Sequence, residues 1–423
     1  MNINEEVDSL LLSSYRLALD FRGLASLMRG INPIYILESL NRLYLSHKIG
    51  SEIFSHFSGS ANSPNSDNEH YNKRLPVPHL HDYDWRFSNN GIQAISKYVE
   101  SVINRGNVKT VVCLGCPTIF GHYQKNPKND VEFYLIDFNA HKHFPHDDSL
   151  NSHCIKDCNV NYDFSDHTDA CSIFADIIIM DPPWYMEYYK KFFDICRSIC
   201  SDHCSVITAL PSNLTRDTVE DENVELINYL LRNGYYNICL HNNAVSYDTP
   251  PFERNVLSAY NIRNYPSDWR YGNVLTADMS SRSELSPGSN RLSPVFRSWF
   301  EKSIGIVRFK LTQEYPSETS DTLISLVSIF PDDIYPSFSR RYACDNKFNV
   351  WTSGNRVLMC NNIPLLSVLI EQYSNSDIID FLHAEYGMQL DSCDISAILN
   401  ARSILLDIVR RELLDYGDWA YVN

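Results

Sequence analysis

The sequence predicts an α/β protein whose central sheet is mostly parallel and whose two ends carry smaller modules. From about Asn90 onward, short apolar runs alternate with amphipathic stretches, a pattern typical of parallel strands covered by helices on both faces. The chain has 423 residues, of which 44% are hydrophobic. This is enough for a large core, arranged as one large domain with additions or as two to three domains.

The central region, residues 82–265, is expected to hold the sheet. A helix at "GIQAISKYVESVIN" precedes a strand at "KTVVCLG", and further strands are expected at "EFYLIDFN", near "HCIKDCN", at "ADIIIMD" and at "SVITALP". A second helix, "VELINYLLRNG", is followed by strands at "YYNICLH" and "NVLSAYNI". Ligands of such sheets bind beyond the carboxyl ends of the strands, so the residues that follow each strand are the candidate site.

The N-terminal module, residues 1–57, is expected to be helical or winged-helix-like. Asn32 is a candidate N-cap, Pro33 takes the first helical position, and apolar residues follow at helical spacing. "SEIF" from Ser51 could begin the short strand pair of a winged helix, and a plain helical cap is the alternative. Residues 58–81 are rich in Ser, Asn and charge and are expected to be a loop or linker.

The C-terminal module, residues 266–423, is expected to be α+β or helical. It begins with a loop at "ADMSSRSELSPGSNRLSP", followed by strands at "IVRFKL" and "LISLVSIF". Three helices are expected at "IPLLSVLIEQY", "SDIIDFLHAEYG" and "DISAILNARSILLDIVRRELL". By their spacing, these helices loosely resemble a small winged-helix or PqqD-like module.

Charge and composition restrict the classes of partner and compartment. The formal net charge of −16 argues against broad, sequence-independent adhesion to a phosphate backbone, although it leaves room for a local basic groove. The first residues lack a basic region followed by a long apolar run, and no segment approaches the length of a membrane helix. We therefore expect a cytoplasmic protein that does not contact a membrane.

The twelve cysteines are arranged neither as a short disulfide-rich segment nor as two CxxC zinc-binding motifs. Cys196, Cys200 and Cys204 recur every four residues, on the helix expected after Trp184. This spacing favours core packing over metal binding, so we expect a reduced protein without a metal site.

Small and acidic residues at successive strand ends indicate a nucleoside site. Gly115 ends the first strand, where the backbone can approach a ligand closely. Asp137 ends the next strand roughly twenty residues later, where an acidic residue commonly accepts hydrogen bonds from ribose hydroxyls. Asp157 and Asn159 lie near the following strand end, at the edge expected to touch an adenine.

The tetrapeptide Asp181-Pro182-Pro183-Trp184 follows a buried strand. The prolines fix φ and donate no N–H, so their carbonyls can serve as rigid acceptors, while Trp184 and Tyr185 offer flat faces. A carboxylate, a fixed carbonyl and a stacking ring suit a planar, weakly nucleophilic amine such as the N6 of adenine. Both N–H bonds would be held and the lone pair directed at an incoming methyl group.

The DPPW motif resembles the signature of the amino-methyltransferase branch of S-adenosylmethionine-dependent methyltransferases, and MT-A70 adenine-N6 methyltransferases carry the same tetrapeptide. The segments "CLGCPTIFGHY", "FYLIDFNAHKHF" and "ADIIIMDPPW" are similar to another subgroup. It contains the zinc-finger CCHC-type rRNA adenine-N6 methyltransferase and a eukaryotic elongation-factor lysine methyltransferase. The similarity covers about Asp82–Asn264. The Gly-Cys-Pro of the first loop departs from a Gly-rich turn.

The resemblance implies a Rossmann-like methyltransferase fold with S-adenosyl-L-methionine as cofactor. "YDWRFS" resembles the segment that lines the cofactor before the first strand, and "FERNVLSAYN" resembles the final hairpin strand. The residues assigned to the cofactor are Trp85, Phe87, Gly115, Pro117, Asp137, Asp157, Asn159 and Asp181. Those assigned to catalysis are Asp181, Pro182, Pro183 and Trp184, with Trp184 and Tyr185 stacking on the substrate.

The leading interpretation is methyl transfer to an amine, with adenine N6 of RNA or DNA as the first choice. The terminal modules would position the nucleic acid, and a homodimer or heterodimer is compatible with the chain. Aminopropyl transfer to a polyamine is an alternative that an acidic protein suits, although the first loop lacks the acidic run of such enzymes. Protein-lysine methylation and a catalytically silent, methyltransferase-like scaffold also stay open.

Overall fold

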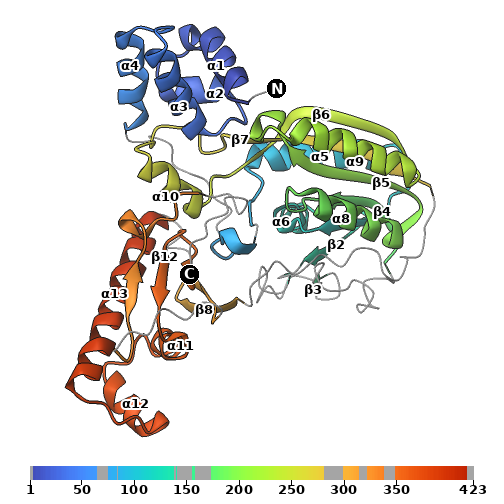
Figure 1. Ribbon diagram of the computed structural model, residues 1–423. Helices are drawn as coiled ribbons and strands as arrows, with labels where there is room; N and C mark the ends of the chain where they lie inside the picture. The colour runs from blue at the N-terminus through green and yellow to red at the C-terminus, as the bar shows by residue number, and fades with distance from the viewer. Residues whose placement is uncertain are drawn as a thin grey trace. The chain divides into compact units, whose positions relative to one another are not determined.

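The computed structural model describes residues 3–63, 75–82, 84–137, 140, 155–157, 173–280, 299–313, 322–337 and 348–416. Within these ranges, no helix has the length and apolar character needed to cross a bilayer. The chain divides into two compact units (Figure 1). The first comprises Met1–Leu75, Trp85–Thr249 and Ile262–Ser293, and the second comprises Pro76–Asp84, Pro250–Asn261 and Pro294–Asn423.

A seven-stranded sheet forms the core of the first unit. Its strands are β1 (Thr110–Leu114), β2 (Glu132–Asp137), β3 (Ile155–Asp157), β4 (Ala175–Met180), β5 (Cys200–Pro211), β6 (Tyr235–Tyr247) and β7 (Arg270–Met279). They lie in the order β3-β2-β1-β4-β5-β7-β6. All neighbours up to β5 are parallel, whereas β7 runs antiparallel to both β5 and β6. The predicted Rossmann-like α/β class is therefore confirmed.

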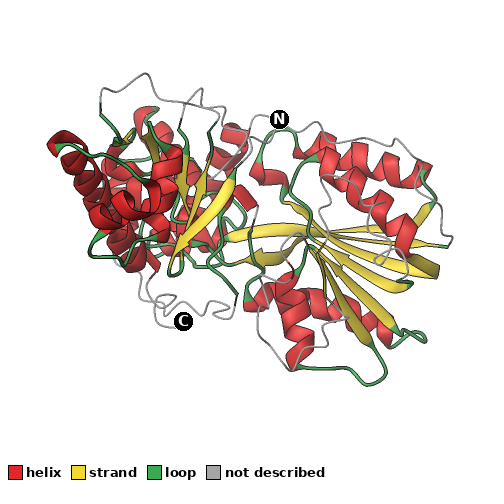
Figure 2. Ribbon diagram, turned by 90° about the horizontal axis from the view of Figure 1, so that it is seen from below, coloured by secondary structure: helices red, strands yellow, loops and turns green. Residues whose placement is uncertain are grey.

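Helices cover both faces of this sheet, as Figure 2 shows. They are α5 (Asn89–Ile103), α6 (Pro117–Lys125), α8 (Met186–Ile199) and α9 (Val219–Arg232). Helix α5 packs beside α6, and α8 packs beside α9. The buried apolar positions of β1, such as Val111 and Cys113, join residues of α5 and α6 in one hydrophobic core. Burial on both faces explains why these strands are continuous apolar runs.

The N-terminal module is a group of helices. They are α1 (Ile3–Ser14), α2 (Phe21–Leu27), α3 (Pro33–Leu45) and α4 (Ser51–Ala61), with a short 3₁₀ turn at Tyr15–Leu17. Asn32 caps α3 as predicted, because its Oδ1 accepts a hydrogen bond of 3.0 Å from the Ile34 amide. The module meets the sheet region of the same unit where the Gly30 amide donates to the Trp269 carbonyl at 3.1 Å.

The strand expected at "SEIF" is wrong, because these residues begin α4. Phe54 stacks on Tyr44 at 4.7 Å, and the Phe57 and Ala61 side chains, at helical spacing, are buried. A pattern with a period of three to four residues is stable as a helix, not as a strand. The plain helical alternative is therefore the correct one for this segment.

The strand expected at "NVLSAYNI" is also wrong, and with it the likeness of "FERNVLSAYN" to a final hairpin strand. The segment forms α10 (Pro251–Ala259), with Pro251 at the first turn and Phe252, Val256 and Leu257 buried along one side. The strand that completes the sheet is β7, which pairs between β5 and β6. A boundary at residue 265 would therefore cut the sheet before one of its strands.

The second unit contains a five-stranded sheet in the order β10-β12-β11-β9-β8. Its strands are β8 (Phe300–Ile304), β9 (Val307–Leu311), β10 (Leu326–Ser328), β11 (Val350–Thr352) and β12 (Val357–Cys360). Its helices are α10 together with α11 (Ile363–Glu371), α12 (Ile378–Tyr386) and α13 (Ser392–Tyr416). The three predicted C-terminal helices and the strands at "IVRFKL" and "LISLVSIF" are confirmed. This unit also contains short 3₁₀ turns at Leu80–Asp82 and Pro331–Asp333, and the first unit contains one at Asn213–Thr215.

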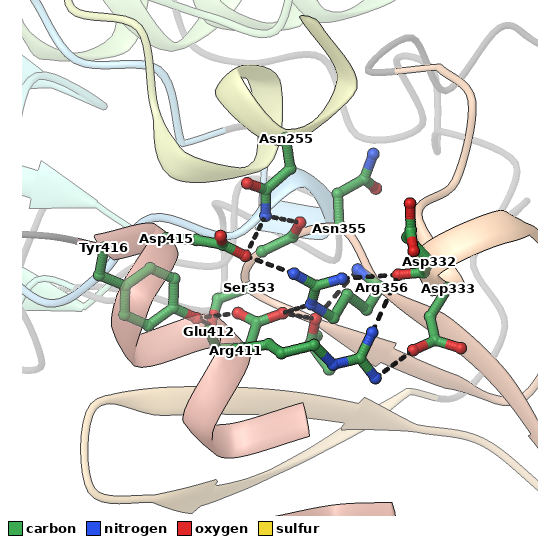
Figure 3. A network of polar contacts seen from close by, with 12 residues as sticks. Asn255, Asp332, Asp333, Ser353, Asn355, Arg356, Arg411, Glu412, Asp415 and Tyr416 are labelled. Carbon is green, nitrogen blue, oxygen red and sulfur yellow. Dashed lines mark hydrogen bonds and ion pairs between the residues drawn. The ribbon is translucent and has the colours of Figure 1, made fainter. Parts of the chain in front are cut away.

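A polar network ties α10, α13 and the β11–β12 hairpin together (Figure 3). Arg356 is paired with Glu412 and Asp415 of α13, and the Asn255 amide of α10 donates to Asp415 at 3.2 Å. A Cβ on Gly354 would collide with the Glu412 carboxylate. The side chains of Glu412 and Arg356 are almost wholly buried, so this network is part of the interior of the second unit.

The cysteine stripe expected on one helix is divided between two elements. Helix α8 ends at Ile199, so Cys196 lies on α8 whereas Cys200 and Cys204 lie on β5. All three thiols are buried, as core packing requires. In the described part of the chain, no group of three or more His, Cys, Asp or Glu residues is arranged to hold a metal ion.

Candidate active site

Strand register brings the predicted strand-end residues into one row. Leu114 of β1 pairs with Ile136 of β2 and with Met180 of β4, so Gly115, Asp137 and Asp181 follow side by side at the carboxyl edge. Asp137 in turn pairs with Asp157 of β3. Asn159, the remaining predicted residue of this row, lies outside the described residues. The row is the place at which a Rossmann-like sheet binds its ligand.

Gly115 adopts a conformation that favours glycine. Its φ is +68°, in the left-handed region, and its amide donates to the Ile136 carbonyl at 2.9 Å. A Cβ there would lie 3.5 Å from the Phe192 ring and 3.6 Å from the Asp181 carbonyl oxygen. Pro117 follows as the first residue of α6 and is buried. A bare backbone turn beside acidic strand ends fits the approach of a nucleoside cofactor.

The acidity of Asp181 is strongly altered by its surroundings. Burial raises its pKa from 3.8 to about 7, while hydrogen bonds from Tyr247 and Trp184 limit the rise. The Tyr247 hydroxyl donates to Asp181 Oδ1 at 2.8 Å. Burial and the adjacent Asp181 also raise the pKa of Tyr247 well above its usual value, so this hydroxyl remains a neutral donor. The carboxyl of Asp181 is thus close to half-ionised at neutral pH.

The pKa of the Cys116 thiol indicates that the carboxylates of Asp181 and Asp137 both lie near it. Burial raises the pKa of Cys116, and the nearby carboxylates of Asp181 and Asp137 raise it further. Both carboxylates therefore lie within electrostatic reach of the same sulfur atom. A thiol with a raised pKa stays protonated and is a poor nucleophile, so we assign Cys116 no covalent role.

The two proline carbonyls of the Asp-Pro-Pro-Trp turn differ in their hydrogen bonds. The Pro183 carbonyl accepts one, and the Pro182 carbonyl receives none from a described residue. The Tyr185 amide donates to the Pro183 carbonyl at 2.6 Å. Pro182 is buried, and no hydrogen bond joins its carbonyl to another part of the described chain. A buried carbonyl gains from a hydrogen-bond partner. An N–H group of a bound acceptor would meet this need beside the Asp181 carboxylate.

Trp184 is held at several points. The Arg216 guanidinium donates to the Trp184 carbonyl at 2.9 Å and is paired with Glu222. The indole meets the Tyr247 ring edge-to-face, with 5.6 Å between centroids, and the Arg270 guanidinium lies 5.7 Å from the indole centroid. Tyr185 is half-buried beside Tyr188. The predicted stacking of a substrate on Trp184 or Tyr185 remains a prediction.

Trp85 and Phe87 pack on the core of the first unit, and Phe87 lies against the end of β6. Phe87 forms a β-bridge with Tyr247, and their rings stack at 4.8 Å. The Phe87 side chain is buried in the core, whereas Trp85 is half-buried beneath the guanidinium of Arg270, which lies 5.3 Å from its ring centroid. Their assignment to the cofactor stays a prediction. In the structure, Phe87 supports the tyrosine that binds Asp181.

Sequence reasoning missed Tyr247, Arg270 and Arg216. The strand expected at "YYNICLH" ends at His241, but β6 continues to Tyr247. Apolar residues at Ala244 and Val245, followed by the turn sequence "DTPP", could have indicated the later strand end. Arg270 had no such signal, because it reaches this edge only through the antiparallel pairing of β7 with β6, in which Tyr247 pairs with Arg270.

Comparisons with known proteins bear on this geometry. Residues 81–241 match the family model described as "Probable N6-adenine methyltransferase". No curated protein matches the chain. The match agrees with the prediction of a methyltransferase enzyme that uses S-adenosylmethionine.

Several solved structures are similar at low identity. A branched-chain polyamine synthase from Thermus thermophilus shares 10% identity over 66% of this chain and 88% of its own, with a TM-score of 0.47. A mutein of that synthase shares 11% over 67% and 93%, with a TM-score of 0.48. A SAM-dependent methyltransferase from Aquifex aeolicus shares 12% over 44% and 88%, with a TM-score of 0.27. At such TM-scores, these likenesses carry no argument about the acceptor.

Proposed function

We propose that the protein is an S-adenosylmethionine-dependent methyltransferase that modifies the exocyclic N6 of adenine in a nucleic acid. The observation that supports this most is the state of Asp181. This carboxyl ends β4, is bonded by neutral donors, and has a pKa raised to about 7 by burial. The next residue, Pro182, has a carbonyl that receives no hydrogen bond from a described residue. Together these two groups would form a paired acceptor for two N–H bonds.

The row formed by Gly115, Asp137 and Asp157 would hold the cofactor. When bound there, S-adenosylmethionine supplies an electrophilic methyl group. The left-handed turn at Gly115 gives close backbone access, and Asp137 accepts hydrogen bonds from the ribose hydroxyls. Asp137→Ala should weaken cofactor binding by roughly 1.5–3 kcal/mol, the usual worth of a hydrogen bond to a charged group. Titration calorimetry measures this directly.

Asp181 and the Pro182 carbonyl would orient the amine. Each accepts one N–H bond of the adenine amino group, so the nitrogen lone pair points away from both acceptors and toward the methyl donor. Formation of the N–C bond, with cleavage of the methyl–sulfur bond of the cofactor, would leave the nitrogen positively charged, and it would then have to lose a proton. A carboxylate whose pKa is near 7 both stabilises that charge and can receive the proton.

Local charge favours a nucleic acid over a cationic acceptor. The Arg270 guanidinium lies beside the Trp184 ring, whereas the charge of Arg216 is compensated by Glu222. Arginine recognises phosphate and would repel the ammonium groups of a polyamine or a lysine. The net charge of −16 favours the cation instead, and for this reason aminopropyl transfer to a polyamine is the second candidate. Charges next to the acceptor outweigh distant ones, because salt screens beyond about 10 Å.

The test is a transfer assay with methyl-labelled S-adenosylmethionine. Adenine-containing RNA and DNA oligonucleotides, spermidine and a lysine-rich protein are offered separately to the wild type and to Asp181→Asn. We expect label in N6-methyladenine with the wild type, and a loss of activity with intact cofactor binding in the variant. A parallel reaction with decarboxylated S-adenosylmethionine and spermidine examines the second candidate. Label confined to that reaction would replace the proposed function.

A further inference from the structure

The turn that follows β4 contains two consecutive prolines, which have no N–H with which to fix the backbone. Its first residue is held from one side, because the Asp181 amide donates to a carbonyl of β1 at 3.4 Å. Its last residue is held from the other side, because Nη2 of Arg216 donates to the Trp184 carbonyl at 2.9 Å. The Pro182 carbonyl therefore lies between two fixed points.

Arg216 belongs to the loop that follows β5, residues 212–218. Strand β5 runs parallel to β4 and pairs with it, so the segments that follow both strands lie at the same edge of the sheet. Glu222 of α9 holds the guanidinium, because Arg216 Nε donates to its Oε1 at 3.3 Å and Nη2 is paired with its other oxygen. One planar group thus bridges a carboxylate and the Trp184 carbonyl, which a lysine ammonium does not reproduce.

The loop that carries this arginine is anchored by three elements of the first unit. Asn213 Oδ1 accepts hydrogen bonds from the side-chain amides of Asn273 of β7 at 3.3 Å and of Asn223 of α9 at 3.4 Å. The Ser212 hydroxyl donates to the Asn243 side chain of β6 at 2.9 Å. A loop fixed in this way presents its arginine in one position, with little freedom left to lose when a ligand binds.

The N-terminal helices add two contacts to the same loop. The Ile3 amide, at the start of α1, donates to Asp217 Oδ1 at 2.6 Å. Gly30 lies so close to the loop that a Cβ on it would be 3.1 Å from the Ser212 hydroxyl oxygen, and its φ of +84° also favours glycine. The N-terminal module therefore packs on the loop that holds the Trp184 carbonyl.

We propose that Arg216 is a positioning residue for the acceptor amine. By holding the Trp184 carbonyl, it fixes the direction of the Pro182 carbonyl, so that this carbonyl and the Asp181 carboxylate receive the two N–H bonds of the amine together. The inference rests on the proposed function and names the side chain that prepares its paired acceptor. A shift of the Pro182 carbonyl misdirects the nitrogen lone pair, and so lowers the rate of transfer more than the binding of the substrate.

Steady-state kinetics with methyl-labelled S-adenosylmethionine and an adenine oligonucleotide separates positioning from binding. The variants are Arg216→Met, which removes the donors, and Arg216→Lys, which keeps the charge beside Glu222. Arg232→Gln removes an exposed arginine at the end of α9 and is the matched control. Calorimetry gives the affinity for S-adenosylmethionine, and a melting temperature reports the folding of each variant.

We expect the kcat of Arg216→Met to fall by roughly 10²-fold, which is the cost of a small misplacement of the reacting groups. The KM for the oligonucleotide should change little by comparison. Arg216→Lys should recover only part of the kcat, because an ammonium cannot hold both partners in the same plane. The affinity for S-adenosylmethionine should be the same in all proteins, and Arg232→Gln should behave as the wild type.

Hydrogen exchange measured by mass spectrometry tests the contact without an acceptor. The amides at the start of α8, which follow Trp184 closely in the chain, should exchange faster in Arg216→Met than in the wild type. The amides of β1 should keep their protection, because local opening of the turn leaves the sheet intact. Unchanged exchange at the start of α8 would show that Arg216 does not hold this turn.

Three kinetic results would overturn the assignment. A wild-type kcat in Arg216→Met would remove the positioning role, and a raised KM with an unchanged kcat would make Arg216 a direct contact of the substrate. Losses of kcat and of cofactor affinity that accompany a lower melting temperature in both Arg216 variants would reduce its role to folding. If the wild type methylates no adenine, the proposed function fails. The exchange comparison, and the same kinetics with whichever amine is methylated, then decide the role of Arg216.

Discussion

The two units each contain a buried carboxylate, and the two carboxylates have opposite acidities. In the first unit, burial raises the pKa of Asp181 to about 7, and its hydrogen-bond partners are the neutral groups of Tyr247 and Trp184. In the second unit, burial also raises the pKa of Asp82, but Arg308 and Lys310 outweigh it and hold the value well below the usual range. Both carboxylates are buried, so the difference between these two pKa values follows from the charge of their partners.

The ion cluster of the second unit is structural. Arg308 and Lys310 of β9 both pair with Asp82 and with Glu301 of β8. The pKa of Glu301 is accordingly lowered to about 2. These charges neutralise one another and leave no group poised to exchange a proton near neutral pH. Among the described residues, no cation affects the pKa of Asp181, and this carboxyl is poised to exchange a proton near neutral pH. A perturbed pKa of this kind is frequent at catalytic sites.

Removal of Asp181 should have the largest effect on activity. Asp181→Ala eliminates the acceptor that orients the amine and receives its proton, so we expect the transfer rate to fall by roughly 10²–10⁴-fold. Cofactor affinity, measured by calorimetry, should largely persist. Asp82→Ala is the contrasting variant, and we expect it to lower the melting temperature. A variant lacking Asp181 with wild-type turnover would refute the catalytic role.

Removal of a cation from the ion cluster of the second unit should have the largest effect on stability. Arg308→Met leaves Asp82 and Glu301 with less compensation in a buried setting, so unfolding should become easier by about 3–5 kcal/mol. Lys302→Met, which breaks the more exposed pair with Glu371, is the control and should cost less than about 1 kcal/mol. Urea denaturation compares the two. Equal effects would show that the buried cluster is not important for stability.

The two carboxylates should respond to pH in opposite directions. The folded pKa of Asp181 exceeds its unfolded value of 3.8, so this residue lowers stability as pH rises from about 4 to 7. Asp82 has a lowered folded pKa, so its contribution is present above about pH 4 and is lost as pH falls further.

We therefore expect Asp181→Asn to melt a few degrees above the wild type at alkaline pH and equally at acidic pH. Asp82→Asn should melt below the wild type at neutral pH, with a gap that closes in acid. Melting curves across pH test both. The same sign of change for both variants at neutral pH would undermine the comparison.

A smaller effect is expected when the Tyr247 hydroxyl is removed. Tyr247→Phe deletes a donor that favours the ionised form of Asp181, so the pKa of Asp181 should rise further. Loss of one hydrogen bond to a charged group, about 1.5–3 kcal/mol, corresponds to an upward shift of roughly one to two pH units. The midpoint of the pH–rate curve measures this shift. An unchanged midpoint would remove Tyr247 from the control of Asp181.

Local sequence signals were sufficient for the strand-end residues. Gly115, Asp137 and Asp181 each follow an apolar run, and parallel pairing aligns the ends of such runs without further information. Tyr247 and Arg270 could not be found in this way, because they reach the site through antiparallel pairing between β6 and β7.

The two wrong strand assignments have a similar cause. The segments at Ser51 and at Asn255 are short and apolar, and both strands and helices fit so few residues. The buried side of each helix is defined by neighbours that are distant in the sequence. The second sheet was anticipated only at β9 and β10, and its remaining strands, β8, β11 and β12, had no counterpart in the sequence prediction.

The most direct test of the central claim is the pH dependence of methyl transfer to an adenine oligonucleotide. Because the Asp181 carboxylate must be ionised to accept the amine N–H bond, and its pKa is about 7, the rate with the wild type should rise through about pH 7 and then level off. Asp181→Asn should show a low rate without this step. A wild-type rate that is already maximal at about pH 5, where a carboxyl of ordinary pKa is ionised, would contradict the account.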